Sequence, residues 1–454
     1  MKRYDVCIIG GGPAGSKSAK ILAKAGKRVC LVEKSEASLG GTCLNEGCIP
    51  TKNYLQSSEY IKKASYFANQ GVDVNINGLN LSQLKEKTKN LLSLLRGGII
   101  KGLKENSVDL FFGEASFVSK NEIVLDSDKE RISADIFIIA TGSSHKEHPL
   151  LKVDDNFIIS SKEVFSLEEL PKDLLIVGAG VIGCEFATFF NSVGVNVHLA
   201  EFTPSILPLE DEDVSKTILR EFKKQKIKVD VSINAVSYEI KDGKIEVTFE
   251  SKKGVESKAY DKVLISIGRV PNTSSLGLDR ASVETDERGF VKVDENFQTS
   301  NPNIYAIGDV VNTPALAHVA YFEAKVVCDF ILETKREKLN PVVPNVVFTS
   351  PQVGSTGKKE RELKEEGISY GVEKLFFKSL GMPKIKGDDS GFFKLLLDSE
   401  KNILGCAIVG YDATETINQV ALAINSNKST DDIKQMIFAH PTISESFLEI
   451  AESI

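Results

Sequence analysis

One closely spaced pair among the seven cysteines, Cys43 and Cys48, is the first candidate for chemistry in this 454-residue chain. The pair lies in the segment Gly40–Lys52. A zinc site needs about four nitrogen or sulfur ligands, and the sequence holds no second Cys/His cluster. Positions i and i+5 point apart on a regular helix, so a bridge needs a locally opened turn, which Gly47 and Pro50 permit. The segment therefore predicts a redox-active disulfide, with two unpaired buried cysteines as the alternative.

Thiols at a helix N-terminus have a lowered pKa and are good nucleophiles, so we expect thiolate character in this pair. A carboxylate at Glu46 would raise the thiol pKa values if it faces them. The remaining cysteines stand alone in apolar segments and are predicted to be buried packing residues: Cys7, Cys30, Cys184, Cys328 and Cys406.

Two glycine-rich segments each follow an apolar strand and open a helix. In both copies an acidic residue lies 18 positions after the third glycine. This context predicts two βαβ dinucleotide sites, in which the glycines let the backbone approach a pyrophosphate and the acid binds a ribose. The alternative is that both segments are structural glycine turns of an α/β fold, each followed by an acidic residue by chance. The residues are Gly10, Gly12, Gly15 and Glu33 in the first copy, and Gly178, Gly180, Gly183 and Glu201 in the second.

Two such sites imply a bound flavin and a diffusing nicotinamide dinucleotide. The carboxylate of Glu201 favours NAD over NADP, because it pairs with a ribose hydroxyl and repels a 2′-phosphate.

The repeat extends to a second matched pair, Asp135–Gly142 and Asp261–Gly268, with seven positions from Asp to Gly in each. The first copy is about 42 residues longer and holds the cysteine pair and an expected amphipathic helix at 82–105. A third apolar strand ends at Ile304–Asp309.

From about residue 340 the pattern predicts an α+β domain. Its expected strands are 346–348, 373–378, 392–397 and 403–409, and its expected helices are 414–426 and 430–437.

The predicted fold class is therefore α/β, with two Rossmann-like dinucleotide-binding domains and a C-terminal α+β domain. The expected divisions are 1–146 for the first part of the FAD domain, 147–268 for the NAD domain, 269–338 for the second part of the FAD domain and 339–454 for the C-terminal domain.

Composition excludes several other classes. The formal net charge of −7, without a Lys/Arg tract, argues against a nucleic-acid partner. The longest apolar run, Leu174–Cys184, is about half of the ~20 residues that a membrane helix needs. Basic or Arg-rich leader patterns are absent before Tyr4. These features predict a cytoplasmic protein without membrane contact.

Combined and in order, several segments resemble the pyridine nucleotide–disulfide oxidoreductases over essentially the full length, and most of all the members that oxidise dihydrolipoamide. The segments are Gly40–Lys52, Ala140–Ser143, Gly178–Glu185, Gly268–Asn272, Ala306–Asp309, Leu316–His318 and Ala439–Glu445.

The resemblance implies roles for the matching positions. Cys43 is the thiol that meets substrate, and Cys48 passes electrons to the flavin. Lys52 and Glu185 form an ion pair near the flavin. His440, oriented by Glu445, is the general base in the active site of the other subunit. The other expected cofactor contacts are Gly41, Thr42, Gly113, Ala115, Thr141, Gly142, Ser143, Gly268, Asp309, Ala315, Leu316, Ala317 and His318.

The resemblance further implies FAD and NAD as cofactors and a homodimer, with 339–454 as its dimerisation domain. It also implies no metal, and lipoyl domains of a 2-oxoacid dehydrogenase or glycine-cleavage complex as substrate. Glu46 and Thr51 depart from the small apolar residue and the Ser that are usual in this segment. His145, His148 and His198 carry no context for chemistry.

Three alternatives remain open. A glutathione-type NADPH reductase needs basic residues after Glu201, and a mercuric reductase needs a C-terminal cysteine pair; the sequence has neither. A structural subunit of a dehydrogenase complex has no need of the cysteine pair or of His440.

Overall fold

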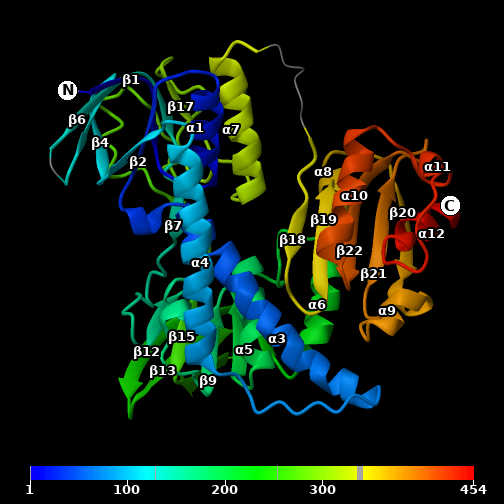
Figure 1. Cartoon of the computed structure of the whole chain (residues 1–454). Coiled ribbons are helices and arrows are strands. Elements are labelled where there is room, and N and C mark those ends of the chain that lie inside the picture. The colour runs from blue at the N-terminus through cyan, green and yellow to red at the C-terminus, as the bar shows by residue number, and fades with distance from the viewer. Residues whose placement is uncertain (1, 128, 253, 335–340) are drawn as a thin grey trace. The chain divides into compact units, whose positions relative to one another are not determined.

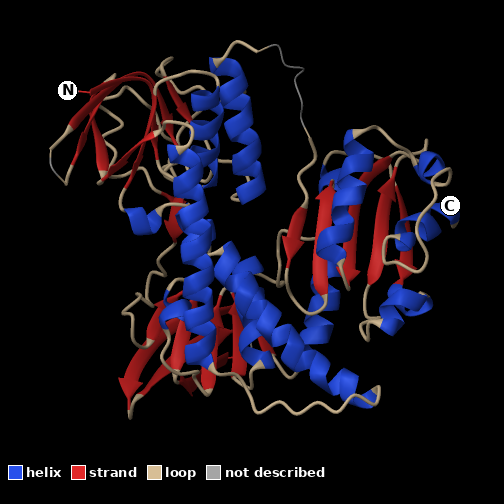
Figure 2. Cartoon of the chain, viewed as in Figure 1, coloured by secondary structure: helices blue, strands red, loops and turns tan. Residues whose placement is uncertain are grey.

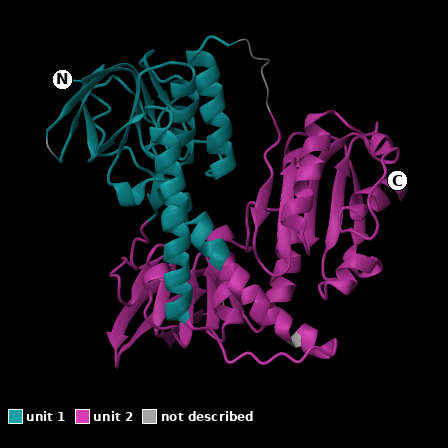
Figure 3. Cartoon of the chain, in the orientation of Figure 1, with its two compact units in different colours: residues 1–53, 81–146, 268–338 teal, residues 54–80, 147–267, 339–454 magenta. Residues whose placement is uncertain are grey.

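The computed structural model describes residues 2–127, 129–252, 254–334 and 341–454, and it is built of helices and sheets in alternation (Figures 1 and 2). The chain forms two compact units (Figure 3). Unit 1 comprises Met1–Asn53, Leu81–Lys146 and Gly268–Lys338, and unit 2 comprises Tyr54–Asn80, Glu147–Ile267 and Leu339–Ile454.

Unit 1 is organised around a sheet of order β3-β2-β1-β6-β5-β4, with β17 pairing with β6. The pairs formed by β3, β2, β1, β6 and β17 are parallel, whereas β4 and β5 are antiparallel additions. Its strands are β1 (Lys2–Ile9), β2 (Val29–Glu33), β3 (Asp109–Phe112), β4 (Ala115–Ser119), β5 (Glu122–Leu125), β6 (Arg131–Ile139) and β17 (Ile304–Ala306).

Alternate residues of β1 enter the hydrophobic cores on the two faces of this sheet: Cys7 and Ile9 on one side, Val6 and Ile8 on the other. Burial of both faces is typical of a parallel sheet covered by crossover helices. A short ladder, β7 (Ser143–His145) with β16 (Arg269–Pro271), lies beside it. The helical elements that include unit 1 residues are α1 (Pro13–Lys24), η1 (Glu36–Ser38), α2 (Gly41–Asn45), α3 (Cys48–Asn69), α4 (Leu81–Lys104) and α7 (Ala317–Ile331).

Unit 2 contains a second parallel sheet of order β11-β10-β9-β15-β8 and an antiparallel meander β12-β13-β14. Its strands are β8 (Ile158–Ser160), β9 (Asp173–Val177), β10 (Asn196–Glu201), β11 (Lys228–Val231), β12 (Ile233–Lys241), β13 (Lys244–Ser251), β14 (Gly254–Tyr260) and β15 (Lys262–Ile265). The helices of this part are η2 (Glu163–Ser166), α5 (Val181–Ser192) and α6 (Glu212–Lys224).

The C-terminal part of unit 2 is an antiparallel sheet of order β18-β19-β22-β21-β20, with α10 packed on β19 and β22. The strands are β18 (Asn345–Val347), β19 (Gln352–Gly357), β20 (Gly371–Phe376), β21 (Phe392–Leu397) and β22 (Ile403–Gly410). The helices are α8 (Glu360–Glu365), η3 (Phe377–Ser379), α9 (Gly381–Ile385), α10 (Ala413–Asn425), α11 (Thr430–Ile433) and α12 (Glu445–Glu452).

This architecture confirms the predicted fold class. The helix expected at 82–105 is α4, and the five lone cysteines are buried. The expected division at 338/339 lies outside the described residues. Among the described residues, none of the helices is both long and apolar enough to cross a membrane.

The helix expected at 430–437 is wrong in its extent, because α11 ends at Ile433. A capping box, in which Ser429 and Asp432 satisfy each other's backbone N–H groups, starts this helix. Further along, Met436 and Ile437 are exposed, so no buried apolar side chain anchors a second turn.

His198 on β10 is almost fully buried and is not the unremarkable residue that the sequence suggested. Its Nδ1 lies 2.5 Å from the Tyr260 hydroxyl, and its Nε2 lies 2.9 Å from Asp230. Burial lowers the pKa of His198 to about 4, with a further contribution from Lys228, and outweighs the opposing charge of Asp230. The imidazole is therefore neutral in the folded protein at neutral pH.

We expect the stability of unit 2 to fall as the pH drops from 6.5 towards 4. The unfolded chain takes up a proton on this imidazole below pH 6.5 whereas the folded chain does not, which costs up to about 3 kcal/mol. Urea unfolding followed by circular dichroism at several pH values measures this slope. His198→Gln should flatten it, and His145→Gln, at a half-buried position, should not. Equal slopes in His198→Gln and the wild type contradict the assignment.

Candidate active site

Each glycine of the first turn meets a different environment. A Cβ at Gly10 would lie 2.3 Å from the carbonyl oxygen of Ala140, and one at Gly15 would lie 1.9 Å from the carbonyl oxygen of Gly10. A Cβ at Gly12 would meet only the Cα of Gly41, at 3.7 Å. The outer glycines are thus required by packing of strand, turn and helix, whereas the middle one leaves the backbone open to a ligand. This division of roles fits a dinucleotide pyrophosphate.

The second turn repeats this pattern in unit 2. A Cβ at Gly178 would lie 2.5 Å from the carbonyl oxygen of Ser266, and one at Gly183 would lie 1.9 Å from that of Gly178. A Cβ at Gly180 would have no described atom within 4 Å apart from its chain neighbours. The residues present therefore fit a second dinucleotide.

The acid that follows each turn is tied to it through the backbone. Glu33 Oε2 accepts from the N–H of Gly11 at 2.7 Å, and Glu201 Oε2 accepts from the N–H of Ala179 at 2.6 Å. Burial raises the pKa of Glu33, although the hydrogen bond from Gly11 opposes this effect. Each carboxylate is held at the carboxyl end of its strand, where a ribose is expected.

The cysteine pair spans a break between two helices. Cys43 is in α2, the chain leaves helical geometry at Glu46 and Gly47, and Cys48 is the first residue of α3. This break is the locally opened turn that the sequence analysis required. The structure describes the pair in its dithiol form, with the Cys43 thiol hydrogen bonded to Cys48.

The dithiol segment packs directly on the first glycine turn. A Cβ at Gly41 would lie 2.8 Å from the Cα of Gly12, so only glycine permits this approach; Gly41 also has a φ of +66°. Thr42, next in α2, is exposed. The side chain of Asn45 donates to the Gly41 carbonyl at 2.9 Å, and Arg96 of α4 donates to the Asn45 amide oxygen at 2.6 Å. These contacts fix the pair beside the expected flavin pyrophosphate.

The expectation of lowered thiol pKa values is wrong for Cys43 in the dithiol form. The hydrogen bond with Cys48, followed by burial, raises the pKa of Cys43 well above its usual range, and Lys52 opposes this only in part. The Glu46 carboxylate acts on Arg269, where it counters the lowering of the arginine pKa by burial. Cys43 therefore stays protonated until a base or a bound partner changes its surroundings.

Arg269 and Asp309 flank Ser143 in a polar cluster at the β7–β16 ladder. The Ser143 hydroxyl donates to Asp309 at 2.7 Å and accepts from Arg269 Nε at 2.7 Å. Beside it, Thr141 and Asn272 exchange hydrogen bonds through side chain and backbone. The sequence pattern of Gly268–Asn272 does not single out Arg269 and Asn272, which the structure brings into contact with the expected cofactor residues Ser143 and Thr141.

The remaining expected FAD contacts also lie in unit 1. Gly113 donates its N–H to the carbonyl oxygen of Glu33 at 2.9 Å. Glu323 of α7 is buried and accepts from the N–H of Gly308 at 2.6 Å, so it fixes the turn that presents Asp309. Ala115 begins β4, Gly142 and Gly268 flank the β7–β16 ladder, and Ala315, Leu316, Ala317 and His318 lead into the first turn of α7.

His440 and Glu445 meet across the turn before α12, as the intervening Pro441 led us to expect. His440 Nδ1 lies 2.7 Å from Glu445 Oε1, and Glu445 Oε2 accepts from the N–H of Thr442 at 2.7 Å. The hydrogen bonds from Thr442 and His440 lower the pKa of Glu445. The imidazole side chain is 83% exposed, so its other nitrogen faces outward.

The predicted pairing of Lys52 with Glu185 remains a prediction. Lys52 is in the first turn of α3 in unit 1, whereas Glu185 belongs to α5 in unit 2. Glu185 is buried there and accepts from the backbone N–H of Phe348 at 3.0 Å.

Comparison with known proteins agrees with this geometry. Residues 4–324 match the family model of the pyridine nucleotide-disulphide oxidoreductases, and residues 343–451 match the dimerisation domain of that family. Dihydrolipoyl dehydrogenase 1, mitochondrial, of Arabidopsis thaliana is 38% identical over 98% of this chain and 89% of its own length. The mitochondrial dihydrolipoyl dehydrogenase of Sus scrofa is 37% identical over the same shares.

Solved structures give the same fold. The HOCl-induced flavoprotein disulfide reductase RclA of Escherichia coli has a TM-score of 0.90 at 27% identity, with 99% of each chain covered. LpdA of Mycobacterium tuberculosis has a TM-score of 0.91 at 24% identity, over 100% of this chain and 99% of its own.

The chain therefore belongs to the pyridine nucleotide-disulphide oxidoreductase family. It is a flavin-dependent disulfide oxidoreductase whose cofactors are FAD and NAD.

The second glycine turn allows packing and binding to be separated by two similar substitutions. Gly180→Ala adds a methyl group in open space, so we expect a melting temperature within about 2 °C of the wild type. The methyl group obstructs the dinucleotide, so NADH affinity should fall at least about tenfold. Gly183→Ala should lower both the melting temperature and the NADH affinity, because its Cβ collides with the backbone carbonyl of Gly178. Differential scanning fluorimetry measures the melting temperature, and NADH titration of the enzyme with its flavin already reduced measures the affinity. Wild-type NADH affinity in Gly180→Ala excludes binding at this turn.

Proposed function

We propose that this protein oxidises protein-bound dihydrolipoamide to lipoamide with NAD as the final acceptor, as a dihydrolipoyl dehydrogenase. The carrying observation is the outward-facing imidazole of His440, held by Glu445, in a chain that also bears the Cys43–Cys48 pair. The level of identity to dihydrolipoyl dehydrogenases over nearly the whole chain supports the choice of substrate.

His440 acts as the base in the proposed reaction. Glu445 occupies Nδ1 and orients the ring, which leaves Nε2 to take a proton from a substrate thiol. The substrate thiolate attacks Cys43 Sγ of the enzyme disulfide and releases Cys48 as a thiolate. The second substrate thiol attacks the mixed disulfide and its proton passes to the leaving Cys43 sulfur. Cys43 is thereby released as a thiol and the cyclic disulfide product forms, while the first proton stays on His440 and Cys48 stays a thiolate.

Two electrons thereby move from the substrate to the enzyme cysteines. The chemistry that FAD supplies when bound is the conversion of these two electrons into a hydride for NAD. The chain's own contribution is to hold the pair against the first glycine turn and to keep Cys43 protonated after reduction. Its raised pKa disfavours back-attack on the released product.

We further propose that the protein works as a homodimer in which His440 serves the dithiol of the partner subunit. The family's dimerisation domain spans residues 343–451 and includes this histidine. The preceding segment exposes large apolar side chains: Met436 is 54% and Ile437 is 100% accessible in the single chain. Such residues are typical of a surface that is covered in an assembly.

The proposed partners are lipoyl domains of a 2-oxoacid dehydrogenase or glycine-cleavage complex, and the proposed compartment is the cytoplasm. The buried cysteines outside the dithiol segment are described as thiols, which suits a reducing compartment. The dihydrolipoyl dehydrogenases of Arabidopsis thaliana and Sus scrofa are named as mitochondrial proteins, and mitochondria are reducing as well.

A panel of substrates tests the activity. We expect NADH formation from dihydrolipoamide and NAD, with NADP much poorer because the buried Glu201 carboxylate repels a 2′-phosphate. The same preparation is assayed for NADH- and NADPH-driven reduction of lipoamide, glutathione disulfide and Hg²⁺. Turnover of another disulfide without turnover of lipoamide overturns the proposed substrate and favours a reductase such as RclA.

The His440–Glu445 pair gives a second test. His440→Gln should lower the rate of dihydrolipoamide oxidation by about 10²–10⁴-fold, since it removes the base. Glu445→Gln should lower the same rate by a smaller factor, because the ring loses its orienting carboxylate. NADH oxidation by an artificial one-electron acceptor bypasses the dithiol and should stay near the wild-type rate. The matched control is Glu449→Gln, an exposed position on the same helix. Wild-type dithiol kinetics in His440→Gln would exclude the proposed base.

A further inference from the structure

The segment 208–211 connects the region of Glu201 to α6. Each of its residues forms a hydrogen bond or an ion pair with the C-terminal part of unit 2. Four consecutive residues each make a polar contact with a different residue of that part. We call this segment the strap. Arg361 donates to the Pro208 carbonyl at 3.1 Å, Lys359 to the Leu209 carbonyl at 2.5 Å, Asn345 to the Glu210 carboxylate at 2.5 Å, and Lys394 pairs with the Asp211 carboxylate at 3.3 Å.

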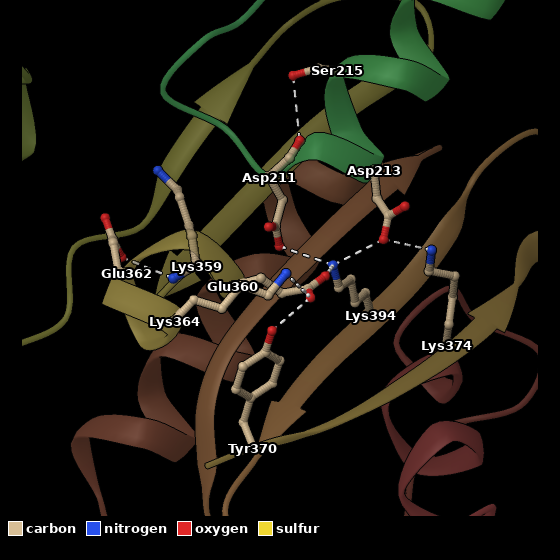
Figure 4. Close-up of polar contacts among 10 residues, drawn as sticks. All are labelled: Asp211, Asp213, Ser215, Lys359, Glu360, Glu362, Lys364, Tyr370, Lys374 and Lys394. Carbon is tan, nitrogen blue, oxygen red and sulfur yellow. Dashed lines mark hydrogen bonds and ion pairs between the residues drawn. The ribbon is translucent and has the colours of Figure 1, made fainter. Parts of the chain in front are cut away.

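Lys394 is the innermost of these contacts. It lies on β21 among apolar residues, and its side chain has no solvent exposure. Figure 4 shows its ammonium group between the carboxylates of Asp211, Asp213 and Glu360, with Asp213 at 2.9 Å. Burial lowers the pKa of Lys394, but Glu360, Asp213 and Asp211 together raise it above its usual value. A buried ammonium group stays charged only when nearby carboxylates balance its charge, and these carboxylates in turn are stabilised by the ammonium group.

The residue before the strap, Leu207, contacts the second glycine turn. Its N–H donates to the carbonyl oxygen of Ala179 at 2.8 Å. The N–H of the same Ala179 donates a hydrogen bond to the Glu201 carboxylate. Leu207 has a φ of +46°, a left-handed conformation that is rare for a bulky residue and that its surroundings must maintain. The hydroxyl of Ser215 in α6 supports it with a 3.3 Å hydrogen bond to the Leu207 carbonyl.

We propose that Lys394 is a positioning residue for the NAD site, acting through the strap to hold Leu207 against the second glycine turn. Lys394 touches neither cofactor nor substrate in this proposal. It gives the C-terminal part of the chain a role in dinucleotide binding, separate from its role in dimerisation. The inference rests on the proposed placement of NAD at Gly178–Glu201 and deepens it.

Lys394→Met in the holoenzyme tests the proposal, because methionine fills similar space without charge. The expected result is about tenfold weaker NADH binding. NADH fluorescence is recorded anaerobically with the flavin already reduced, so that NADH cannot pass its hydride to FAD during the titration. The rate at which dihydrolipoamide bleaches the flavin, measured without NAD, should stay within about twofold of the wild type. In steady state KM for NAD should rise more than kcat falls.

Because loss of a buried cation can prevent folding, a second variant loosens the strap from its solvent side. The double substitution Lys359→Gln and Arg361→Gln removes the hydrogen bonds to the carbonyls of Leu209 and Pro208, at a part-exposed and an exposed position. It should also weaken NADH binding several-fold. The matched control is Lys374→Met, since Lys374 pairs with Asp213 at 2.8 Å on the outer side of the cluster. It should leave NADH affinity unchanged.

Weaker NADH binding with a preserved bleaching rate in Lys394→Met or in the double variant supports the proposal. Wild-type NADH affinity in a folded Lys394→Met overturns it, and so does wild-type affinity in the double variant when Lys394→Met does not fold. An equal loss of the bleaching rate overturns it too, because that indicates general damage. If dihydrolipoamide fails to bleach the wild-type flavin, the proposed substrate is wrong, yet the NADH titrations still decide the role of Lys394.

Discussion

The hydrogen bond from the turn backbone to the acid at the end of the next strand is the constraint on which both cofactor sites depend. Gly11 donates to Glu33 and Ala179 donates to Glu201, at nearly equal distances in the two units. The bond connects the glycine turn to the neighbouring parallel strand, so the helix N-terminus and the acid have a fixed relation. The spacing of 18 residues between the third glycine and the acid follows from the length of helix and strand between them.

The sequence predicted the features that arise from local patterns and failed where distant polar residues meet. Glycine turns, the amphipathic helix α4 and the lone buried cysteines all carry their signal within a few residues. Arg269 lies 126 residues from Ser143 in sequence, and its contact depends on the antiparallel ladder between two three-residue strands. Lys394 gave no signal at all, because a charged residue within an apolar strand looks like an outward-facing position until its partners from α6 are known.

The thiol pKa shows a conflict between two local effects. A helix N-terminus lowers a thiol pKa, and Cys43 lies in the first turn of α2. The hydrogen bond between the Cys43 thiol and Cys48, together with burial, outweighs that effect and raises the pKa of Cys43. The helix-terminus effect can be expected from the segment itself, whereas the degree of burial of Cys43 and its hydrogen bond with Cys48 are visible only in three dimensions. In the proposed reaction the two groups have separate tasks: the solvent-facing imidazole of His440 takes a proton from the substrate, and the raised pKa keeps Cys43 protonated after reduction.

The hydrogen bond from the N–H of Lys146 to the carbonyl of Gly268, at 2.9 Å, joins the residues where the chain leaves unit 1 and returns to it. The stretch between them is thus inserted at a single point, with its two ends adjacent on a short β-ladder. Insertions of this kind disturb the host little, because the host backbone is nearly continuous across the junction. The strands of unit 1 on either side of this junction can therefore keep their pairing when the length of the stretch 147–267 changes.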